Sequence, residues 1–153
     1  MKKFKFTLQT VHNVREMRQE KEELILGQLQ TEAVVAEEAV AQIENSRQTA
    51  IENYSLRLRS GEQLNPMEME LNSKHFASLN QRRIEGEQIV AQKKQACVRQ
   101  TQTVAGAMRE VKITGRLKET QQLRHDLDFA RAEQNGIDEL LSTRFARQKT
   151  RTK

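Results

Sequence analysis

The sequence predicts an all-α protein: a long antiparallel two-helix coiled-coil hairpin whose C-terminal helix is the longer of the two. Three observations support this fold class. Only 36% of the 153 residues are apolar and 4% aromatic, whereas 31% are charged, so a globular core would be poorly filled. The good helix formers Gln, Glu, Arg, Ala and Lys are in excess. The single proline, Pro66, separates two stretches with helical spacing of apolar residues.

The first helix is expected over about residues 7–60. Thr7 can cap its N-terminus, and Phe6 can pack on Val11 as a hydrophobic staple. An apolar stripe follows at spacings of three and four, as in a coiled-coil seam, with polar residues interrupting it between Val14 and Leu24. The residues assigned to this seam are Leu8, Val11, Ile25, Leu29, Ala33, Ala36, Val40, Ile43, Ala50, Tyr54 and Leu58.

The segment SGEQLNPMEME, residues 60–70, contains a helix stop followed by a helix start. Ser60 and Gly61 can form the C-cap of the first helix. Asn65 can cap the second helix, with Pro66 at its first position and Glu68 three residues after the cap. The turn is therefore expected at about residues 61–65. Such a short connection favours an antiparallel hairpin, and a parallel coiled-coil dimer is the alternative fold.

The second helix is expected over about residues 66–147, followed by a basic tail at 148–153, all within one hairpin domain. Its apolar spacing predicts a change of phase after Val111, which resembles a stutter. Gly86 can permit a close approach of the first helix. The residues assigned to the seam are Met69, Phe76, Leu79, Val90, Cys97, Val104, Met108 and Val111, then Leu117, Leu123, Leu127, Ala130, Ile137 and Leu141.

The position of the turn sets the register of the two helices. A turn centred near residue 63 places Val40 against Gly86 and Leu29 against Cys97. At about 1.5 Å per residue the first helix is roughly 80 Å long and the second roughly 120 Å. Residues after about Gln122 then have no partner within the chain, although their apolar spacing continues. This unpaired stretch and the N-terminal phenylalanines predict a binding surface.

Charge and hydropathy restrict the location and the partners. The net charge is +5, and STRFARQKTRTK at the C-terminus is basic without an acidic residue. This tail either meets phosphate, anionic lipid or an acidic protein surface, or is a solvated helix end with favourable charges. No apolar run approaches the roughly 18 to 20 residues of a membrane span, and no signal core is present. With one cysteine there is no internal disulfide, so a cytoplasmic protein is expected.

Signals of an enzyme are missing from the sequence. No phosphate-binding glycine loop occurs, and we expect no catalytic residue, no cofactor and no metal site. His12, His75 and His125 are expected to be ordinary surface or seam residues.

Three further residues have two readings each. Cys97 has basic neighbours that can activate a thiol, but its phase favours a small seam residue. Tyr54 and Phe76 flank the turn and should lie close together. They either fill the seam near the turn or form an aromatic patch for a partner.

The two ends of the chain carry its most distinctive patterns. The opening FKFTLQTVHNVREMRQEKEE has an aromatic start leading into a charged helix. The closing LKETQQLRHDLDFARAEQNGIDELLSTRFAR has Glu133, Ile137, Asp138 and Glu139, followed by basic residues. Both ends resemble the corresponding segments of FliJ-type flagellar export proteins, in which these residues occur at matching spacing. Residues 34–111 match no pattern of the family. The resemblance implies an antiparallel coiled coil like the stalk subunit of rotary ATP synthases, without enzymatic activity.

The same resemblance implies the partners. The protein would be the stalk of the hexameric type III export ATPase ring in the cytoplasm, with both helix termini at the ring's pore. The turn would be directed to the membrane export gate and to export chaperones, which places the protein peripherally at the inner membrane face. The positions implied at the ATPase are Phe4, Phe6, Leu8, Glu133, Ile137, Asp138 and Glu139, and those at the gate are Tyr54 and Phe76.

Two alternative functions stay open at this point. One is the equivalent stalk of a virulence type III secretion system, which the sequence barely distinguishes. The other is a generic coiled-coil scaffold with a basic tail that binds nucleic acid, although no nucleic acid is expected because the tail lacks aromatic residues for base stacking.

Overall fold

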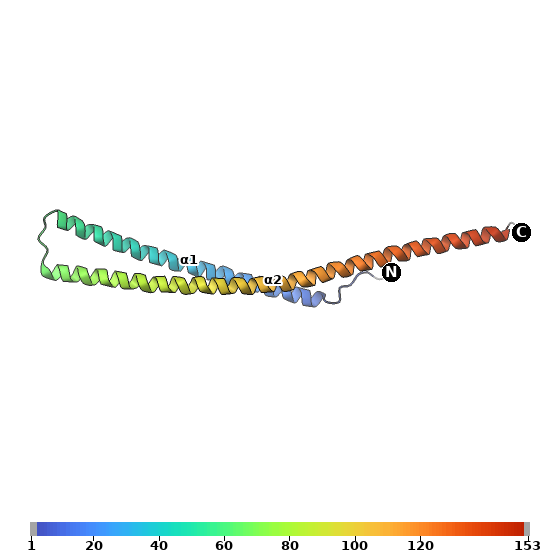
Figure 1. Cartoon of the computed structure of the whole chain (residues 1–153), viewed down its shortest axis with the longest axis horizontal. Coiled ribbons are helices and arrows are strands. Elements are labelled where there is room, and N and C mark those ends of the chain that lie inside the picture. The colour runs from blue at the N-terminus through green and yellow to red at the C-terminus, as the bar shows by residue number, and fades with distance from the viewer. Residues whose placement is uncertain (1–2, 152–153) are drawn as a thin grey trace. The chain divides into compact units, whose positions relative to one another are not determined.

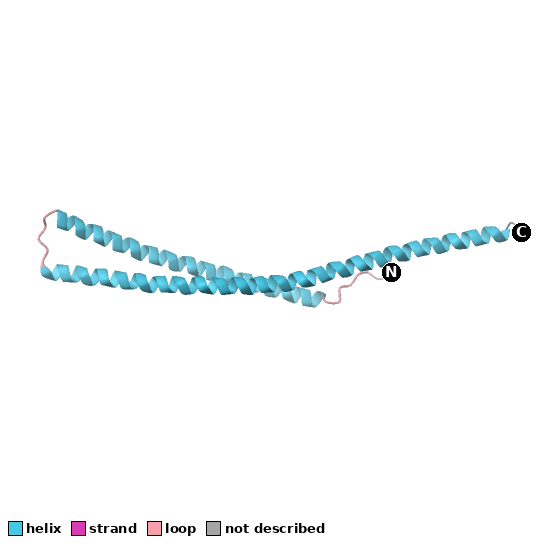
Figure 2. Cartoon of the chain, viewed as in Figure 1, coloured by secondary structure: helices cyan, strands magenta, loops and turns pink. Residues whose placement is uncertain are grey.

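The computed structural model describes residues 3–151, and its side chains are described for residues 3–144. This part of the chain consists of helix α1 (Gln9–Arg59, 51 residues) and helix α2 (Pro66–Arg151, 86 residues) and contains no strand (Figure 2). The prediction of an all-α helical hairpin with a longer C-terminal helix is confirmed. Helix α2 continues to Arg151, past the expected end at 147, so residues 148–151 of the basic tail are helical.

Packing divides the chain into two units, each built from both helices. The turn unit is Glu20–Ala105 and contains the turn between α1 and α2 (Figure 1). The terminal unit combines Met1–Gln19 with Gly106–Lys153. In each unit the segments of α1 and α2 pack antiparallel, because residues early in α1 contact residues late in α2.

The turn has the caps that the sequence predicts. Gly61 follows α1 with a positive φ of 74°, a conformation that glycine adopts without steric cost. The side chain of Asn65 accepts a hydrogen bond from the backbone N–H of Met67 at 3.2 Å. In return the Asn65 N–H donates to Glu68 Oε2 at 3.4 Å, which completes a capping box. These contacts fix α2 to begin at Pro66.

The seam of the turn unit has the predicted register. A Cβ at Gly86 would lie 2.7 Å from Val40 Cγ2, so these two residues face each other and only glycine leaves enough room. Half-buried and buried side chains recur at spacings of four and three along both helices, which is the heptad pattern. Those on α1 include Leu29, Ala33, Ala36, Val40, Ile43, Ala50 and Tyr54, and those on α2 include Phe76, Leu79, Gly86, Val90, Cys97 and Val104.

Several apolar residues assigned to the seam from spacing lie outside it. Leu8, Val11, Leu58, Met69 and Met108 are exposed. The predicted change of phase after Val111 is also wrong. The buried positions of α2 keep their heptad spacing through Thr114, Lys118, Gln121 and His125, while Leu117, Leu123 and Leu127 are exposed. Apolar spacing misleads here because the seam of the terminal unit is made largely of polar residues.

Hydrogen bonds across the helix pair make this polar seam possible. His12 Nδ1 lies 2.8 Å from Thr114 Oγ1, and Thr114 is buried. Arg15 Nη1 donates to the backbone carbonyl of Glu110 at 3.1 Å. Polar side chains can occupy a partly buried contact when they have hydrogen-bond partners. The seam of the terminal unit can therefore contain these polar residues.

Helix α1 begins later than the sequence indicates. Its first i to i+4 hydrogen bond runs from the His12 N–H to the carbonyl of Leu8, so Thr7 lies in the turn before the helix and does not cap it. The preceding chain is held by a hydrogen bond from the Gln9 N–H to the carbonyl of Phe6 at 3.2 Å. Phe6 is buried whereas Val11 is exposed.

Candidate functional site

The C-terminal stretch of α2 is the most open part of the described chain. Every side chain from residue 126 to residue 144 is exposed, and this stretch includes Phe129, Ile137, Leu140 and Leu141. A helix that exposes several large apolar side chains without a partner in its own chain is a candidate for binding another protein.

Several apolar residues of this stretch share one face of the helix, whereas Phe129 and Leu140 lie to the side of it. Because each residue advances an α-helix by about 100°, Leu123, Leu127, Ala130, Ile137 and Leu141 fall within one narrow stripe, which we call the C-terminal stripe. The seam residues Thr114, Gln121 and His125 fall roughly opposite to it on the same helix. The C-terminal stripe is therefore turned away from the seam and open to a partner.

The three acidic residues expected at the ATPase lie on different faces of the helix. Glu133 and Asp138 flank Ile137 on its two sides, and Glu139 lies roughly on the opposite face of the helix. Asp138 accepts a hydrogen bond from Gln134 Nε2 at 3.2 Å. A single partner surface can therefore meet Ile137, Glu133 and Asp138 together, whereas Glu139 points elsewhere.

The N-terminal positions expected at the ATPase have different environments. Phe6 is only 5% exposed. Phe4 is half-buried, and its ring makes an edge contact with the imidazole of His125 at a centroid distance of 5.6 Å. Leu8 is exposed. Of the three, Leu8 has the most exposed side chain in this conformation.

The structure brings Tyr54 and Phe76 together beside the turn. Their rings meet edge to face with centroids 5.9 Å apart, and both side chains are half-buried. They fill the seam near the turn and leave part of each ring accessible. Further apolar side chains near the turn are exposed: Leu58 and Met69, which the sequence analysis assigns to the seam, and Leu56, Met67 and Leu71, which fall outside the seam spacing.

Charged residues hold the turn beside this apolar surface. Arg57 donates from Nε to Glu62 Oε2 at 3.0 Å and from Nη2 to Glu62 Oε1 at 2.7 Å, a bidentate pair. The hydrogen bond to Arg57 and its charge lower the pKa of the Glu62 carboxyl below its ordinary value. Glu68 lies 3.5 Å from the same guanidinium. The turn is thus connected to both helices.

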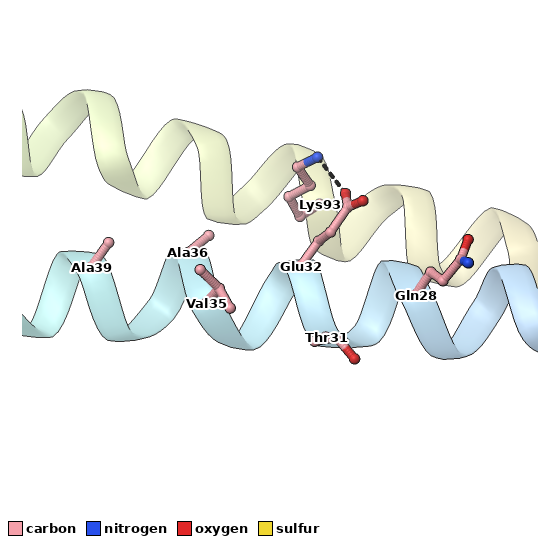
Figure 3. Close-up of a pocket in the computed structure, with 7 residues that line it drawn as sticks. All are labelled: Gln28, Thr31, Glu32, Val35, Ala36, Ala39 and Lys93. Carbon is pink, nitrogen blue, oxygen red and sulfur yellow. Dashed lines mark hydrogen bonds and ion pairs between the residues drawn. The ribbon is translucent and has the colours of Figure 1, made fainter.

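An open groove lies along the side of α1 in the turn unit (Figure 3). Val35, Ala36 and Ala39 provide its apolar lining. Lys93 of α2 reaches Glu32 of α1 with Nζ 2.6 Å from Oε2, and this ion pair lies at the side of the groove. The groove is a shallow surface between side chains of two helices and has no cluster of catalytic groups among its lining residues.

The described residues contain no group of three or more His, Cys, Asp or Glu side chains that could hold a metal ion. None of the helices within the described part is long and apolar enough to cross a membrane. Cys97 lies half-buried in the seam, and His12 and His125 are half-buried in the terminal unit, whereas His75 is exposed.

Comparison with known proteins identifies the family. The family model described as flagellar FliJ protein matches residues 4–150. No curated protein and no solved structure gives a match in the corresponding comparisons. The family match covers nearly the whole chain, including residues 34–111, where the sequence pattern shows no resemblance. The chain belongs to the FliJ family, and it is therefore a component of flagellar type III protein export.

Proposed function

We propose that this protein is the stalk of the flagellar export ATPase ring and links that ring to the export gate and to export chaperones. It would act in the cytoplasm and associate with the inner membrane face through these partners. The observation that carries the proposal is the C-terminal stripe: an apolar helix face, open over residues 126–144, on a chain of the FliJ family.

The chemistry of the stripe fits insertion into a protein ring. Ile137 and Leu141 offer apolar side chains on the face away from the seam, and Glu133 and Asp138 offer carboxylates on either side. An amphipathic helix is recognised by a groove that buries such a stripe while its flanking charges set orientation. We propose Ile137, Glu133, Asp138 and Leu8 as direct contacts of the ATPase, and we place Glu139, on the opposite face of the helix, outside this contact.

The stripe can be tested with one substitution and a matched control. Ile137→Asp places a charge in the C-terminal stripe, whereas Ala132→Asp places the same charge on the opposite, exposed face of the same helix segment. We expect the wild-type protein and Ala132→Asp to raise the oligomerisation and hydrolysis rate of the purified export ATPase. Ile137→Asp should weaken the effect at least about tenfold, the loss of roughly 1.4 kcal/mol or more of apolar contact. An unchanged ATPase in the presence of the wild-type protein would overturn the proposal.

We propose the surface around the turn as the contact for the export gate and chaperones. Tyr54 and Phe76 supply partly accessible aromatic rings, and Leu56, Met67 and Leu71 add exposed apolar side chains on other faces of the helix ends beside the turn. Flexible methionine side chains suit a surface that meets more than one partner. The bidentate pair of Arg57 with Glu62 keeps the turn ordered between these residues.

The gate contact is tested separately from the ATPase contact. The double substitution Leu56→Ser and Met67→Ser removes exposed apolar side chains without touching the seam. We expect it to lower capture of the soluble domain of the gate protein while stimulation of the ATPase stays unchanged. Equal loss of both interactions would contradict two separate surfaces, and retention of gate binding would exclude these residues as contacts.

A further inference from the structure

The chain before α1 covers a part of α2 that α1 does not reach. In the register that places His12 against Thr114, the first residue of α1, Gln9, lies opposite Leu117. The seam positions farther along α2, which are Lys118, Gln121 and His125, are nevertheless half-buried. We call residues 3–8, which lie before the helix, the N-terminal strap.

The strap has two aromatic contacts with the terminal unit. Phe6 is one of the most buried side chains among the described residues. The ring of Phe4 meets His125 edge to face, four residues beyond Gln121 on α2. The hydrogen bond from the Gln9 N–H to the Phe6 carbonyl joins the strap to the first turn of α1. From residue 126 onward the described side chains of α2 are all exposed. The last half-buried residue of α2 is therefore His125, the residue that Phe4 contacts.

We infer that the N-terminal strap is a structural continuation of the seam, and that Phe4 and Phe6 serve ATPase binding as positioning residues rather than as direct contacts. This inference rests on the proposed function for its partner. The strap holds the first turns of α1, positions its own exposed Leu8, and sets His125 as the limit of the covered part of α2.

The physical reason lies in the composition of the adjacent seam. His12, Arg15 and Gln19 face α2 from α1, so little apolar area holds these first turns in place. Helix ends with little burial open locally at low free-energy cost. One buried phenylalanine removes a large apolar surface from water, which is enough to decide whether this end stays paired.

The strap can be tested in the free protein with a fluorescent probe. The chain has no tryptophan, so Phe6→Trp and Leu8→Trp each introduce a single indole at neighbouring positions of unequal exposure. We expect Trp emission at shorter wavelength and weaker quenching by acrylamide for Phe6→Trp than for Leu8→Trp. Equal emission and equal quenching would overturn the strap, irrespective of any ATPase.

Hydrogen exchange gives a second measurement that does not depend on fitting an indole. We expect Phe6→Ala to speed amide exchange in residues 9–19 at least about tenfold, because the free energy of local opening falls by about 1.4 kcal/mol or more. Leu8→Ala, the neighbouring exposed control, should leave these rates unchanged. Unchanged exchange in Phe6→Ala would also overturn the strap.

The positioning role is tested by rescue. We expect Phe6→Ala to raise the half-maximal concentration for ATPase stimulation, since only the strapped fraction binds well, and Phe6→Leu to restore both exchange protection and stimulation. If Phe6→Leu restores protection but not stimulation, the ring itself contacts the ATPase and the positioning role is wrong. Failure of the wild-type protein to act on the ATPase would instead remove the proposed function and leave the free-protein results standing.

Discussion

The turn unit and the terminal unit use the same heptad spacing with different chemistry. In the turn unit the seam contains apolar residues such as Leu29, Val40, Leu79 and Val104. In the terminal unit the facing positions on α1 are polar from His12 to Gln19, and the seam of α2 ends in Lys118, Gln121 and His125. Burial in the terminal unit is concentrated in Phe6, Ala107 and Thr114.

This difference in seam composition should give the two units different stabilities. Apolar burial is non-directional and contributes most of the folding free energy, so the turn unit should carry most of the stability. A polar seam contributes less net free energy but imposes a specific pairing, because each donor or acceptor must keep its partner. The terminal unit, which carries the proposed ATPase contacts, should therefore open more readily than the turn unit.

The largest expected effect comes from the apolar seam of the turn unit. Leu79 is 7% exposed, and Leu79→Ala should lower the free energy of unfolding by about 2 to 4 kcal/mol through lost burial and a cavity. Leu71 is 59% exposed on the same helix, and Leu71→Ala should change stability by no more than about 0.5 kcal/mol. Urea denaturation measures both, and similar values for the two variants would contradict the assignment of the seam.

The close approach at Gly86 should give the next largest effect. Gly86→Leu forces a side chain against Val40, which is stiff in a helix, and should cost about 1 to 3 kcal/mol through overpacking. Gly27→Leu is the control, since a Cβ there meets nothing within 4 Å and the helix should gain up to about 1 kcal/mol. Adding Val40→Ala to Gly86→Leu should recover stability, and a lack of recovery would place Gly86 opposite another residue.

A smaller effect is expected in the polar seam of the terminal unit. Thr114→Val keeps the side-chain shape but removes the hydroxyl that lies 2.8 Å from His12 Nδ1, at a cost of about 1 kcal/mol. Thr120→Val is the control. The hydroxyls of Thr114 and Thr120 each donate to a carbonyl of α2, but Thr120 is exposed. Hydrogen exchange should rise in residues 9–19 for Thr114→Val alone, and a rise confined to residues 20–59 would be evidence against this local role.

The smallest effect is expected at the turn and depends on pH. The pKa of Glu62 is lowered in the folded protein, chiefly by its hydrogen bond with Arg57. A lowered carboxyl pKa stabilises the fold at pH values above the ordinary value of 4.5, and this contribution is lost as the pH falls through the folded pKa. The wild-type protein should be slightly more stable than Glu62→Gln near pH 7, and the difference should vanish in acid. A difference that persists at pH 2 would require another cause.

Much of the fold follows from local signals in the sequence. Gly61, Asn65, Pro66 and Glu68 specify the turn because each satisfies a backbone requirement that depends only on near neighbours. The pairing of Val40 with Gly86 follows from the position of that turn. The C-terminal stripe is also readable from spacing, since it depends on one helix alone.

The remaining features depend on contacts between distant residues. Thr114 and His12 are 102 residues apart in the sequence, and both are polar. The spacing of apolar residues therefore does not reveal which residues of α2 form the terminal seam. The exposed apolar side chains near the turn, such as Leu56 and Met67, stand out only once the seam is known.

By itself the sequence determined two helices, the turn between them and their register, because caps and heptads are properties of neighbouring residues. The tertiary structure decided which residues are covered at the terminal end. The family resemblance implies Phe6 as an ATPase contact, but its side chain is buried in the terminal unit. Burial depends on which surfaces of the folded chain pack together, and the spacing of residues along one helix does not specify it.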